Sequence, residues 1–335
     1  MIVSDRLRDR FSADLGAIWR AGAEDRLGLA VSGGPDSTAL LLLAAAAMPG
    51  RIMVATVDHQ LRPESADEAR HVADICGRLG IPHATLAVTV ADGNVQAEAR
   101  RARYAALAAW MERNGLDALA TAHHADDQAE TLLLRLNRAS GVAGLAGARA
   151  RGKVPGSAML LLRPLLGWRR VELVDLVERA CIAAVQDPTN QDERFDRARI
   201  RAALTEADWL DVHAIARSAA HLADADAALA WAAGREWAET VRIDPAGITY
   251  RCRAPRAVAL RVLARIVEEL DGEEPRGGAV ARLLDTLADG KPGSIGNLVA
   301  KPGADGWRFL NAPPRRTLES RVEKLDPNSP AKPPG

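Results

Sequence analysis

The sequence predicts an α/β fold: a parallel five-stranded sheet with helices on both faces, followed by a smaller, mostly helical domain. Three observations lead to this prediction. Short apolar segments alternate with longer stretches of helical periodicity up to about residue 190, as is typical of parallel sheets. Beyond that point helical patterns dominate. The length of 335 residues suits about two domains.

Five short apolar segments bounded by turn residues are the predicted strands. They are 27–31, 52–57, 83–88, 118–120 and 159–162. Helical periodicity predicts the helices around them. These are 5–20, 36–48, 65–79, 94–114, 125–137 and 168–179. Ligands of parallel sheets bind at the carboxyl ends of the strands, so we expect functional residues just after each strand.

The second half of the chain divides into a domain and a tail. Periodicity predicts helices over 202–241, 254–270 and 278–289, a hairpin over 241–251 and small strands over 294–310. From residue 311 the chain has six prolines in 25 residues, which predicts disorder. We therefore expect a first domain over 1–195, a mainly helical domain over 196–310 and a disordered tail over 311–335.

Composition excludes several classes of protein. The 44 basic and 44 acidic residues balance, which excludes a uniformly basic nucleic-acid binder but leaves room for a local basic face. Cys76, Cys181 and Cys252 lie far apart, which argues against a disulfide scaffold or a cysteine zinc site. The N-terminal residues lack the apolar region of a signal peptide, and the longest apolar stretch, 38–48, is too short to span a bilayer. We expect a cytoplasmic protein without membrane contact.

The strongest local signal is Ser32-Gly33-Gly34-Pro35-Asp36-Ser37, between the first strand and its helix. Glycines let backbone N–H groups approach a phosphate, and a helix start attracts negative charge. Ser32 and Ser37 add hydroxyl donors, and Asp36 is suited to a magnesium ion that neutralises phosphate. No lysine follows the glycines, so this is not the GxxxxGK[ST] loop. The alternative is an ordinary turn with proline in the first helical turn.

Two further segments follow the second and third strands. Asp58 and His59 come after the second strand, where they are placed to border a nucleotide pocket or, alternatively, to cap the next helix. In the helix after the third strand, Arg100 and Arg103 share a face with Gln96. Such a face suits a phosphate or an RNA backbone, although a solvated surface is the common alternative.

Two adjacent histidines and three acids follow the fourth strand. Asp126 and Glu130 lie one helical turn apart with Asp127 near them, an arrangement that suits magnesium or the deprotonation of an amine. His123 or His124 is suited to act as a base or to stabilise a leaving phosphate. Alternatively, acids in a first helical turn simply offset the helix dipole. The spacing is poor for zinc, which we do not predict.

Basic residues concentrate between residues 135 and 201. This segment has 12 arginines and one lysine against seven acids, a net charge of +6 in a neutral protein. It includes Arg163, the sequence Asp187-Pro188-Thr189-Asn190, and Arg197, Arg199 and Arg201. A basic segment beside a catalytic edge suits RNA, and a solvated arginine-rich face is the alternative.

These segments together carry a family resemblance. The hexapeptide resembles the pyrophosphate loop (PP-loop) of the N-type ATP pyrophosphatases, which have a Rossmann-like sheet. The sequences Val57-Asp58-His59-Gln60-Leu61-Arg62, Ala122-His123-His124-Ala125-Asp126-Asp127 and 187–201 resemble one branch, the tRNA(Ile)-lysidine synthetases. The resemblance covers residues 25 to 205, and its length suggests the family's shorter form. One departure is Ala198, where the family has Asn.

The resemblance implies a ligase that uses ATP and Mg²⁺. Such enzymes join free L-lysine to carbon 2 of the wobble cytidine of tRNA(Ile) with a CAU anticodon, releasing AMP and pyrophosphate, and a homodimer is compatible with it. The alternatives are a 2-thiolating PP-loop enzyme, which typically uses paired cysteines, or a non-catalytic nucleotide- or RNA-binding relative. Carried over by position, the resemblance implies catalysis or lysine binding at Asp36, Arg103, His123, Asp126 and Glu130, with Mg²⁺ at Asp36 and Asp126. It implies ATP binding at Ser32, Gly33, Gly34, Pro35, Asp36, Ser37, Asp58 and His59, and tRNA binding at Arg100, Arg163, Arg197, Arg199 and Arg201.

Overall fold

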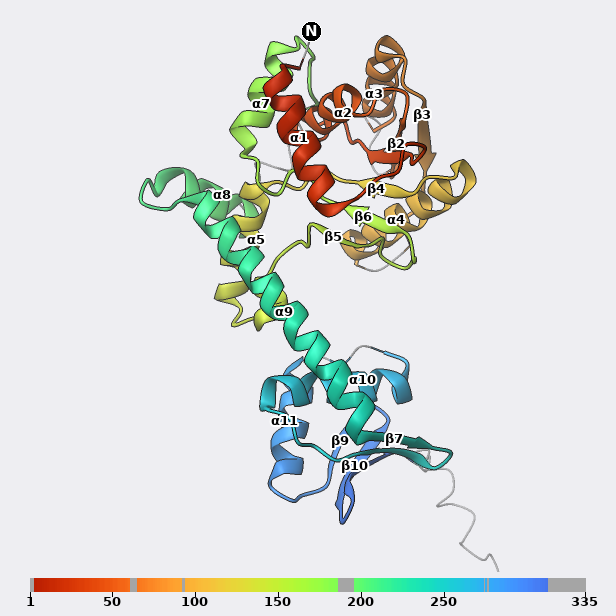
Figure 1. Ribbon diagram of the computed structural model, residues 1–335, viewed down its shortest axis with the longest axis vertical. Helices are drawn as coiled ribbons and strands as arrows, with labels where there is room; N and C mark the ends of the chain where they lie inside the picture. Colours follow the sequence, from red (N-terminus) through yellow and green to blue (C-terminus); the bar gives the residue numbers. More distant parts are fainter. Residues whose placement is uncertain are drawn as a thin grey trace, which may run out of the picture. The chain divides into compact units, whose positions relative to one another are not determined.

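The computed structural model describes residues 3–60, 65–91, 94–185, 196–273, 275 and 277–312. The sequences 61–62 and 187–190 singled out above, and the expected tail from residue 313 on, lie outside the described residues. The chain forms two compact units, the first ending at Asp226 and the second beginning at Ala227 (Figure 1).

The division between the units falls inside helix α9 (Val212–Thr240) rather than at residue 195, where the sequence pattern changes. Helix α8 (Asp196–Glu206) packs on α5 (Ala125–Asn137). Val212 and Ala216 at the start of α9 are buried together with Ala125 and Ala129 of α5. These contacts join residues 196–226 to the first unit.

The first unit is built on a sheet with the strand order β3-β2-β1-β4-β6-β5. The strands are β1 (Leu27–Ala30), β2 (Ile52–Asp58), β3 (His83–Ala87), β4 (Ala118–Ala120), β5 (Arg151–Lys153) and β6 (Leu160–Leu162). The five predicted strands are confirmed as parallel neighbours. The number of strands is corrected to six, because β5 pairs antiparallel with β6 at the edge. Its sequence, Arg-Gly-Lys, has no apolar alternation, so only the pairing with β6 makes it a strand.

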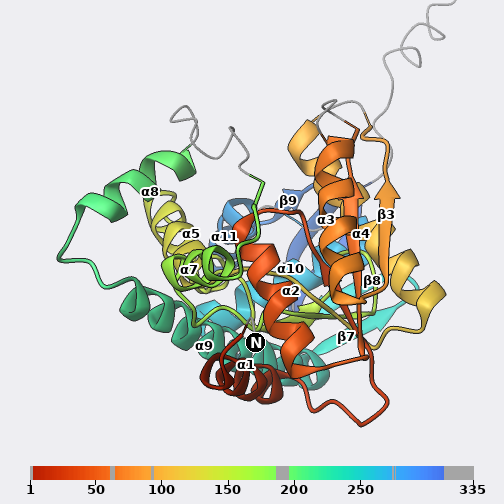
Figure 2. The same ribbon diagram turned by 90° about the horizontal axis from the view of Figure 1, so that it is seen from above.

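Helices cover both faces of this sheet (Figures 1 and 2). Four helices share one apolar core with β1, β2 and β4, and a fifth packs on the opposite face. The four are α1 (Asp5–Ile18), α2 (Pro35–Ala47), α3 (Ser65–Leu79) and α7 (Arg170–Arg179), and the fifth is α4 (Val95–Asn114). A short helix, α6 (Val142–Leu145), follows α5.

Strand β1 shows how the sequence sets the two faces. Leu27 and Leu29 are fully buried in the core under α1 and α2. Gly28, between them, faces α4, and a Cβ there would lie 2.8 Å from the Trp110 ring. Glycine therefore lets Trp110 lie directly on the sheet.

The start of α7 is fixed by α1. Trp168 is fully buried, and its indole N–H donates to Asp14 Oδ2 at 2.8 Å. The Arg10 guanidinium lies 3.9 Å from the centre of the Trp168 ring. Its Nη1 pairs with Glu172 Oε1 at 2.6 Å, and its Nη2 donates to the Gly167 carbonyl at 2.9 Å. These contacts form a clasp between α1 and the start of α7, and α7 also packs on α2.

The second unit has an antiparallel sheet of its own, with the order β7-β8-β11-β10-β9. Its elements are β7 (Val241–Asp244), β8 (Gly247–Tyr250), α10 (Arg256–Asp271), α11 (Gly277–Ala288), β9 (Gly293–Ile295), β10 (Leu298–Gly303) and β11 (Gly306–Asn311). The helices α10 and α11 bury Val262, Leu263 and Leu284 against Phe309 of the sheet. The predicted hairpin, small strands and two helices are confirmed. Among the described helices, none has the length and apolarity needed to cross a membrane.

Candidate functional site

A cavity of about 1180 Å³ opens at the carboxyl edge of the first unit's sheet. Its walls come from the β1–α2 loop, the end of β2, α4, the β4–α5 junction, the start of α7, and α8. The predicted residues that line it are Ser32, Gly34, Pro35, Asp36, Ser37, His59, Arg103, His123, Arg197 and Arg201. The other predicted residues, all in the described part of the chain, lie outside its lining: Gly33, Asp58, Arg100, Asp126, Glu130, Arg163 and Arg199.

The β1–α2 loop is shaped to receive an anion. Gly33 has a φ of +87°, and its missing side chain leaves room for Val185, whose Cγ2 would lie 3.1 Å from a Cβ there. The Val185 N–H donates to the Gly33 carbonyl at 2.9 Å and fixes the loop. Ser37 Oγ accepts from the Ser32 N–H at 3.1 Å and donates to the Gly34 carbonyl at 3.0 Å. No side chain caps α2, so the first N–H groups of the helix face the cavity free to bind phosphate.

An imidazole surrounded by carboxylates lies beside this loop. His124 is buried, and its Nε2 lies 3.6 Å from both Asp36 Oδ2 and Asp127 Oδ2. Its Nδ1 lies 3.6 Å from Asp126 Oδ2. Burial would lower the pKa of His124, but Asp126 and Asp36 outweigh burial and raise this pKa to about 10. His124 is therefore a cation at neutral pH and balances part of the acidic charge.

Asp126 points away from the cavity toward the start of α7. Its Oδ2 accepts from the Arg170 backbone N–H at 2.8 Å, and its Oδ1 lies 3.2 Å from Arg169 Nη2. Burial alone would raise the pKa of Asp126, but His124 and these two donors hold it below its usual range. Both oxygens of Asp126 are thus occupied, which does not fit the expected magnesium ligand.

Glu130 is also occupied, by an arginine of α8. Its carboxylate is almost fully buried, and Arg201 Nε lies 2.7 Å from Oε1 while Arg201 Nη2 donates to Oε2 at 3.3 Å. Arg201 lines the cavity, and Glu130, through its hydrogen bond, raises the pKa of this arginine. Arg197, exposed on the same helix, donates to Thr131 Oγ1 at 3.3 Å. Arg199 is exposed on α8.

The side of the cavity under α4 is cationic. His123 accepts or donates a hydrogen bond of 3.0 Å with Thr121 Oγ1, and burial lowers its pKa to about 4, so it is neutral at pH 7. Burial, with Arg100 nearby, also lowers the pKa of Arg103. Both arginines lie over the ring of Tyr104, at 4.9 Å and 5.5 Å. Among the described residues no carboxylate pairs with either of these two guanidinium groups at this wall, so a bound anion would supply the missing negative charge.

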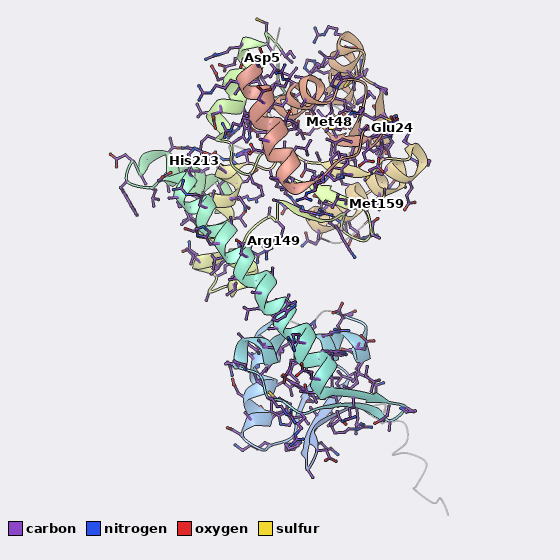
Figure 3. The ribbon with its side chains drawn as sticks, viewed as in Figure 1. Asp5, Glu24, Met48, Arg149, Met159 and His213 are labelled. Atoms are coloured by element: carbon purple, nitrogen blue, oxygen red, sulfur yellow. The ribbon has the colours of Figure 1, made fainter. Side chains whose placement is uncertain are left out.

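Arg163 stands behind this wall. Its Nη1 donates to the Arg149 carbonyl at 2.7 Å, and burial lowers its pKa while Tyr104 raises it. Arg149 in turn pairs with Asp226 of α9 at 2.6 Å, and it is labelled beside that helix in Figure 3. Arg163 therefore supports Tyr104 and does not face the cavity itself.

Asp58 and His59 have different roles: Asp58 is structural, and His59 lines the cavity. Asp58 Oδ1 accepts from Ser65 Oγ at 2.6 Å and from the Gln60 N–H at 2.9 Å, and these bonds hold its pKa below the usual range. Asp58 thus fixes the start of α3. His59 lines the cavity, where burial and then Arg103 lower its pKa.

Sequence reasoning missed Arg170, which lines the cavity, and it preferred Asp126 to the neighbouring Asp127, although Asp127 is the one that lines the cavity. Buried Gln128 clamps the chain behind the site, because its amide donates to the Ala148 carbonyl at 3.0 Å and accepts from the Ala148 N–H at 2.8 Å. Gly147 makes room for this clamp: its φ is +61°, and a Cβ there would lie 2.6 Å from Gln128 Oε1. Helical spacing in a sequence shows neither which carboxylate faces the cavity nor the hydrogen bonds between Gln128 and Ala148.

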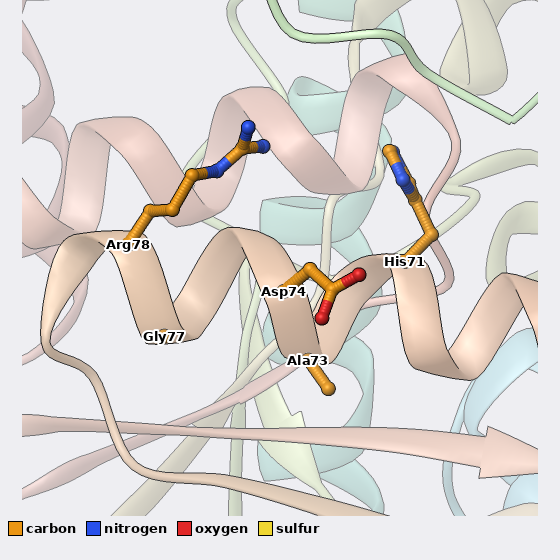
Figure 4. A pocket seen from close by; sticks show the side chains of 5 residues that line it. All are labelled: His71, Ala73, Asp74, Gly77 and Arg78. Carbon is orange, nitrogen blue, oxygen red and sulfur yellow. The ribbon is translucent and has the colours of Figure 1, made fainter.

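A second hollow of about 550 Å³ lies along α3 (Figure 4). All its lining residues come from this one helix, including His71, Asp74 and Arg78. None of them belongs to the predicted site. The phosphate-loop cavity is therefore the candidate active site.

Comparisons with known proteins identify the family. A family model described as the PP-loop domain matches residues 7–208. The tRNA(Ile)-lysidine synthase of Novosphingobium aromaticivorans is 49% identical over 312 residues, covering 92% of this chain and 94% of that protein. The chain belongs to the tRNA(Ile)-lysidine synthase family. As a member of this family it is a ligase of the PP-loop group.

A second tRNA(Ile)-lysidine synthase and one solved structure are also similar to the chain. The Zymomonas mobilis protein of that name is 38% identical, covering 91% of this chain and 94% of its own. The U34-tRNA thiolase NcsA from Methanococcus maripaludis has a TM-score of 0.53 and 15% identity, covering 65% of this chain and 78% of that one. At this identity the likeness to the thiolase shows the shared fold alone.

Proposed function

We propose that this protein ligates free L-lysine to carbon 2 of the wobble cytidine of tRNA(Ile) with a CAU anticodon, using ATP and Mg²⁺. The observation that carries the proposal is one cavity with three kinds of wall: the phosphate loop, the acid–histidine cluster and the cationic wall under α4. The phosphate loop suits ATP, the acid–histidine cluster suits the lysine amine, and the cationic wall suits the tRNA. Family membership supports the same reaction.

The first step is adenylation of the cytidine. The carbonyl oxygen at carbon 2 attacks the α-phosphorus of ATP, a P–O bond forms, and pyrophosphate leaves. The N–H groups at the start of α2, together with Ser32 and Ser37, bind the phosphates. Adenylation makes that oxygen a good leaving group, which a cytosine carbonyl otherwise is not.

Asp36 is the residue that fits a magnesium ion. Its Oδ1 is buried and has no hydrogen-bond partner among the described residues, and a carboxylate oxygen is a preferred Mg²⁺ ligand. Within the described residues, no group of three His, Cys, Asp or Glu side chains forms a metal site by itself. That agrees with Mg²⁺, which is usually held by one or two carboxylates, water and substrate phosphates. The ion would neutralise phosphate charge.

The second step joins lysine. The ε-amine attacks carbon 2, the C–N bond forms, the C–O bond breaks and AMP leaves with the oxygen. The amine must first lose a proton, and Asp127 and His123 line the cavity where that proton can be accepted. His123 is neutral at pH 7 and so can accept a hydrogen bond from the amine. In this proposal His123 keeps its expected role, and Asp127, which lines the cavity, takes the place of Asp126 and Glu130, which do not line it.

The tRNA would be bound by the basic residues around the opening. Arg103 and Arg201 line the cavity, and Arg197, Arg199 and Arg100 are exposed. Arginines bind phosphate oxygens bidentately and so suit an RNA backbone. We also propose that the protein works in the cytoplasm, with its tRNA substrate.

A 2-thiolating enzyme is not favoured. Such an enzyme typically uses cysteine pairs, and none of the three cysteines lines the described walls of the cavity. Cys76 is buried in the core, and burial raises its pKa to about 11.

The test is incorporation of radiolabelled lysine into a CAU-bearing tRNA(Ile) transcript with ATP and Mg²⁺. A transcript with the wobble cytidine replaced is the control substrate, and incorporation only into the first supports the proposal. Asp127→Asn should abolish lysine transfer, whereas Asp175→Asn, exposed on α7, should not change it. ATP turnover with tRNA but without lysine transfer would overturn the choice of nucleophile.

A further inference from the structure

Arg170, which the sequence analysis did not select, lies on the phosphate side of the cavity. It is the first residue of α7, and its side chain lines the same cavity as the β1–α2 loop. Its Nε lies 4.0 Å from Asp36 Oδ1, in the first turn of α2. Its guanidinium forms no hydrogen bond with the described residues and is therefore available to a ligand.

The backbone of Arg170 is held by Asp126. The carboxylate of Asp126 accepts from the Arg170 N–H at 2.8 Å and pairs with the Arg169 guanidinium at 3.2 Å. In the same junction the Ala125 N–H donates to the Trp168 carbonyl at 2.8 Å. The starts of α5 and α7 are thus joined at two points, which fixes the direction in which the Arg170 side chain points away from α7.

The position of Arg170 puts it within reach of a phosphate bound at the start of α2. The helices α2 and α7 pack on each other, and Arg170 Nε at the start of α7 lies 4.0 Å from Asp36 Oδ1 in the first turn of α2. A phosphate bound at the start of α2 is therefore within reach of a flexible arginine beside Asp36. A guanidinium binds phosphate oxygens through two parallel charge-assisted hydrogen bonds. If these oxygens belong to the β- or γ-phosphate, AMP cannot make the interaction.

We propose that Arg170 binds the pyrophosphate part of ATP and that Asp126 is the positioning residue that aims it there. This inference rests on the proposed use of ATP, and it gives Asp126 a role different from the expected metal or lysine ligand. Arg170 holds the departing pyrophosphate as the P–O bond to the α-phosphorus breaks. Asp126 touches no substrate: it holds the start of α7 and also balances the charge of the His124 imidazolium.

Equilibrium binding of ATP and of AMP to the full chain tests the inference without lysine or tRNA. Arg170→Ala should weaken ATP binding about tenfold or more, the usual value of a hydrogen bond to a charged group, and leave AMP binding unchanged. Arg170→Lys should recover part of the affinity. Arg179→Ala, an exposed arginine in the last turn of the same helix, is the matched control and should change neither ligand.

Asp126→Asn separates positioning from lysine binding. It should weaken ATP binding selectively and add little further loss to Arg170→Ala, because both act through one side chain. In the ligation assay the KM for ATP should rise while the KM for lysine stays constant. A rise in the KM for lysine with unchanged ATP binding would overturn the role of Asp126.

The outcomes also separate this inference from the proposed function. Equal effects of Arg170→Ala on ATP and AMP, or no effect on either, overturn the inference even if the wild-type protein transfers lysine. A wild-type protein that binds ATP but transfers no lysine overturns the proposed function, while a selective loss in Arg170→Ala still supports the role of Arg170. A wild-type protein that binds no ATP overturns both.

Discussion

Removing the charge of Glu130 tests whether this carboxylate holds Arg201 or contacts a substrate. The carboxylate is 2% exposed and pairs with Arg201 at 2.7 Å, while the arginine side chain is 32% exposed. Breaking a buried ion pair from one side costs about 3–5 kcal/mol. Glutamine keeps one hydrogen bond and water reaches the arginine, so we expect Glu130→Gln to lower the free energy of unfolding by about 2–3 kcal/mol.

Thermal and urea unfolding measure this loss. For a unit of this size the melting temperature should fall by about 4–12 °C. Arg201→Met removes the other partner, and a double-mutant cycle between the two positions should give a coupling energy of about 2 kcal/mol. Glu178→Gln, exposed on α7, is the control and should leave stability unchanged.

The same variants decide the catalytic question. If Glu130 acts through Arg201, then Glu130→Gln and Arg201→Met weaken tRNA-dependent turnover to a similar degree, and the KM for lysine is constant. A coupling energy under about 0.5 kcal/mol together with a lysine-specific rise in KM would refute the reasoning. Glu130 would then be a lysine ligand, as the sequence suggested.

Three further predictions concern packing, acid stability and thiol reactivity. Gly147→Ala should lower the free energy of unfolding by about 2 kcal/mol or more in urea, because φ is +61° and the added Cβ would displace the Gln128 amide. The control Gly152→Ala, which has open space around it, should change stability little. The pKa of Asp126 is held below its usual value, so the stability that this carboxylate contributes is present above about pH 4 and lost at lower pH. Asp126→Asn should therefore make the free energy of unfolding depend less on pH below about pH 4. An unchanged dependence would contradict this. A thiol reagent at pH 8 should label the exposed Cys181 rapidly and Cys76 only on unfolding, because Cys76 is 1% exposed and its pKa is raised to about 11. Labelling of both cysteines at the same rate would contradict this.

The sequence predicted the elements whose signals are local. The helices 65–79 and 125–137 begin and end at the predicted residues. The predicted helix 94–114 is followed by Gly115, which caps it in the left-handed conformation with a φ of 59°. Strand β5 was missed because its only cause is its antiparallel partner β6.

The site was predictable as a location but not as a set of contacts. Helical spacing correctly placed Asp126 and Glu130 one turn apart, but not the partners that they meet. Arg169 lies 43 residues after Asp126, and Arg201 lies 71 residues after Glu130. Both partners come from later helices, so only the packing of α7 and α8 decides which carboxylates turn away from the cavity. Asp127 lines the cavity and is held there by the start of α5, because its Oδ2 accepts from the His124 backbone N–H at 3.1 Å.

The clasp between α1 and α7 also has a consequence for biosynthesis. Arg10 and its partner Glu172 are separated by 162 residues, so α1 leaves the ribosome long before α7, its partner in the clasp, has been synthesised. At about 5–20 residues per second this wait lasts about 10–30 s. During that time the apolar side of α1, with Phe11 and Leu15, has no α7 to complete its core and is a natural target for chaperones. The candidate site, whose lining includes Arg170 at the start of α7, is therefore completed late in the synthesis of the unit.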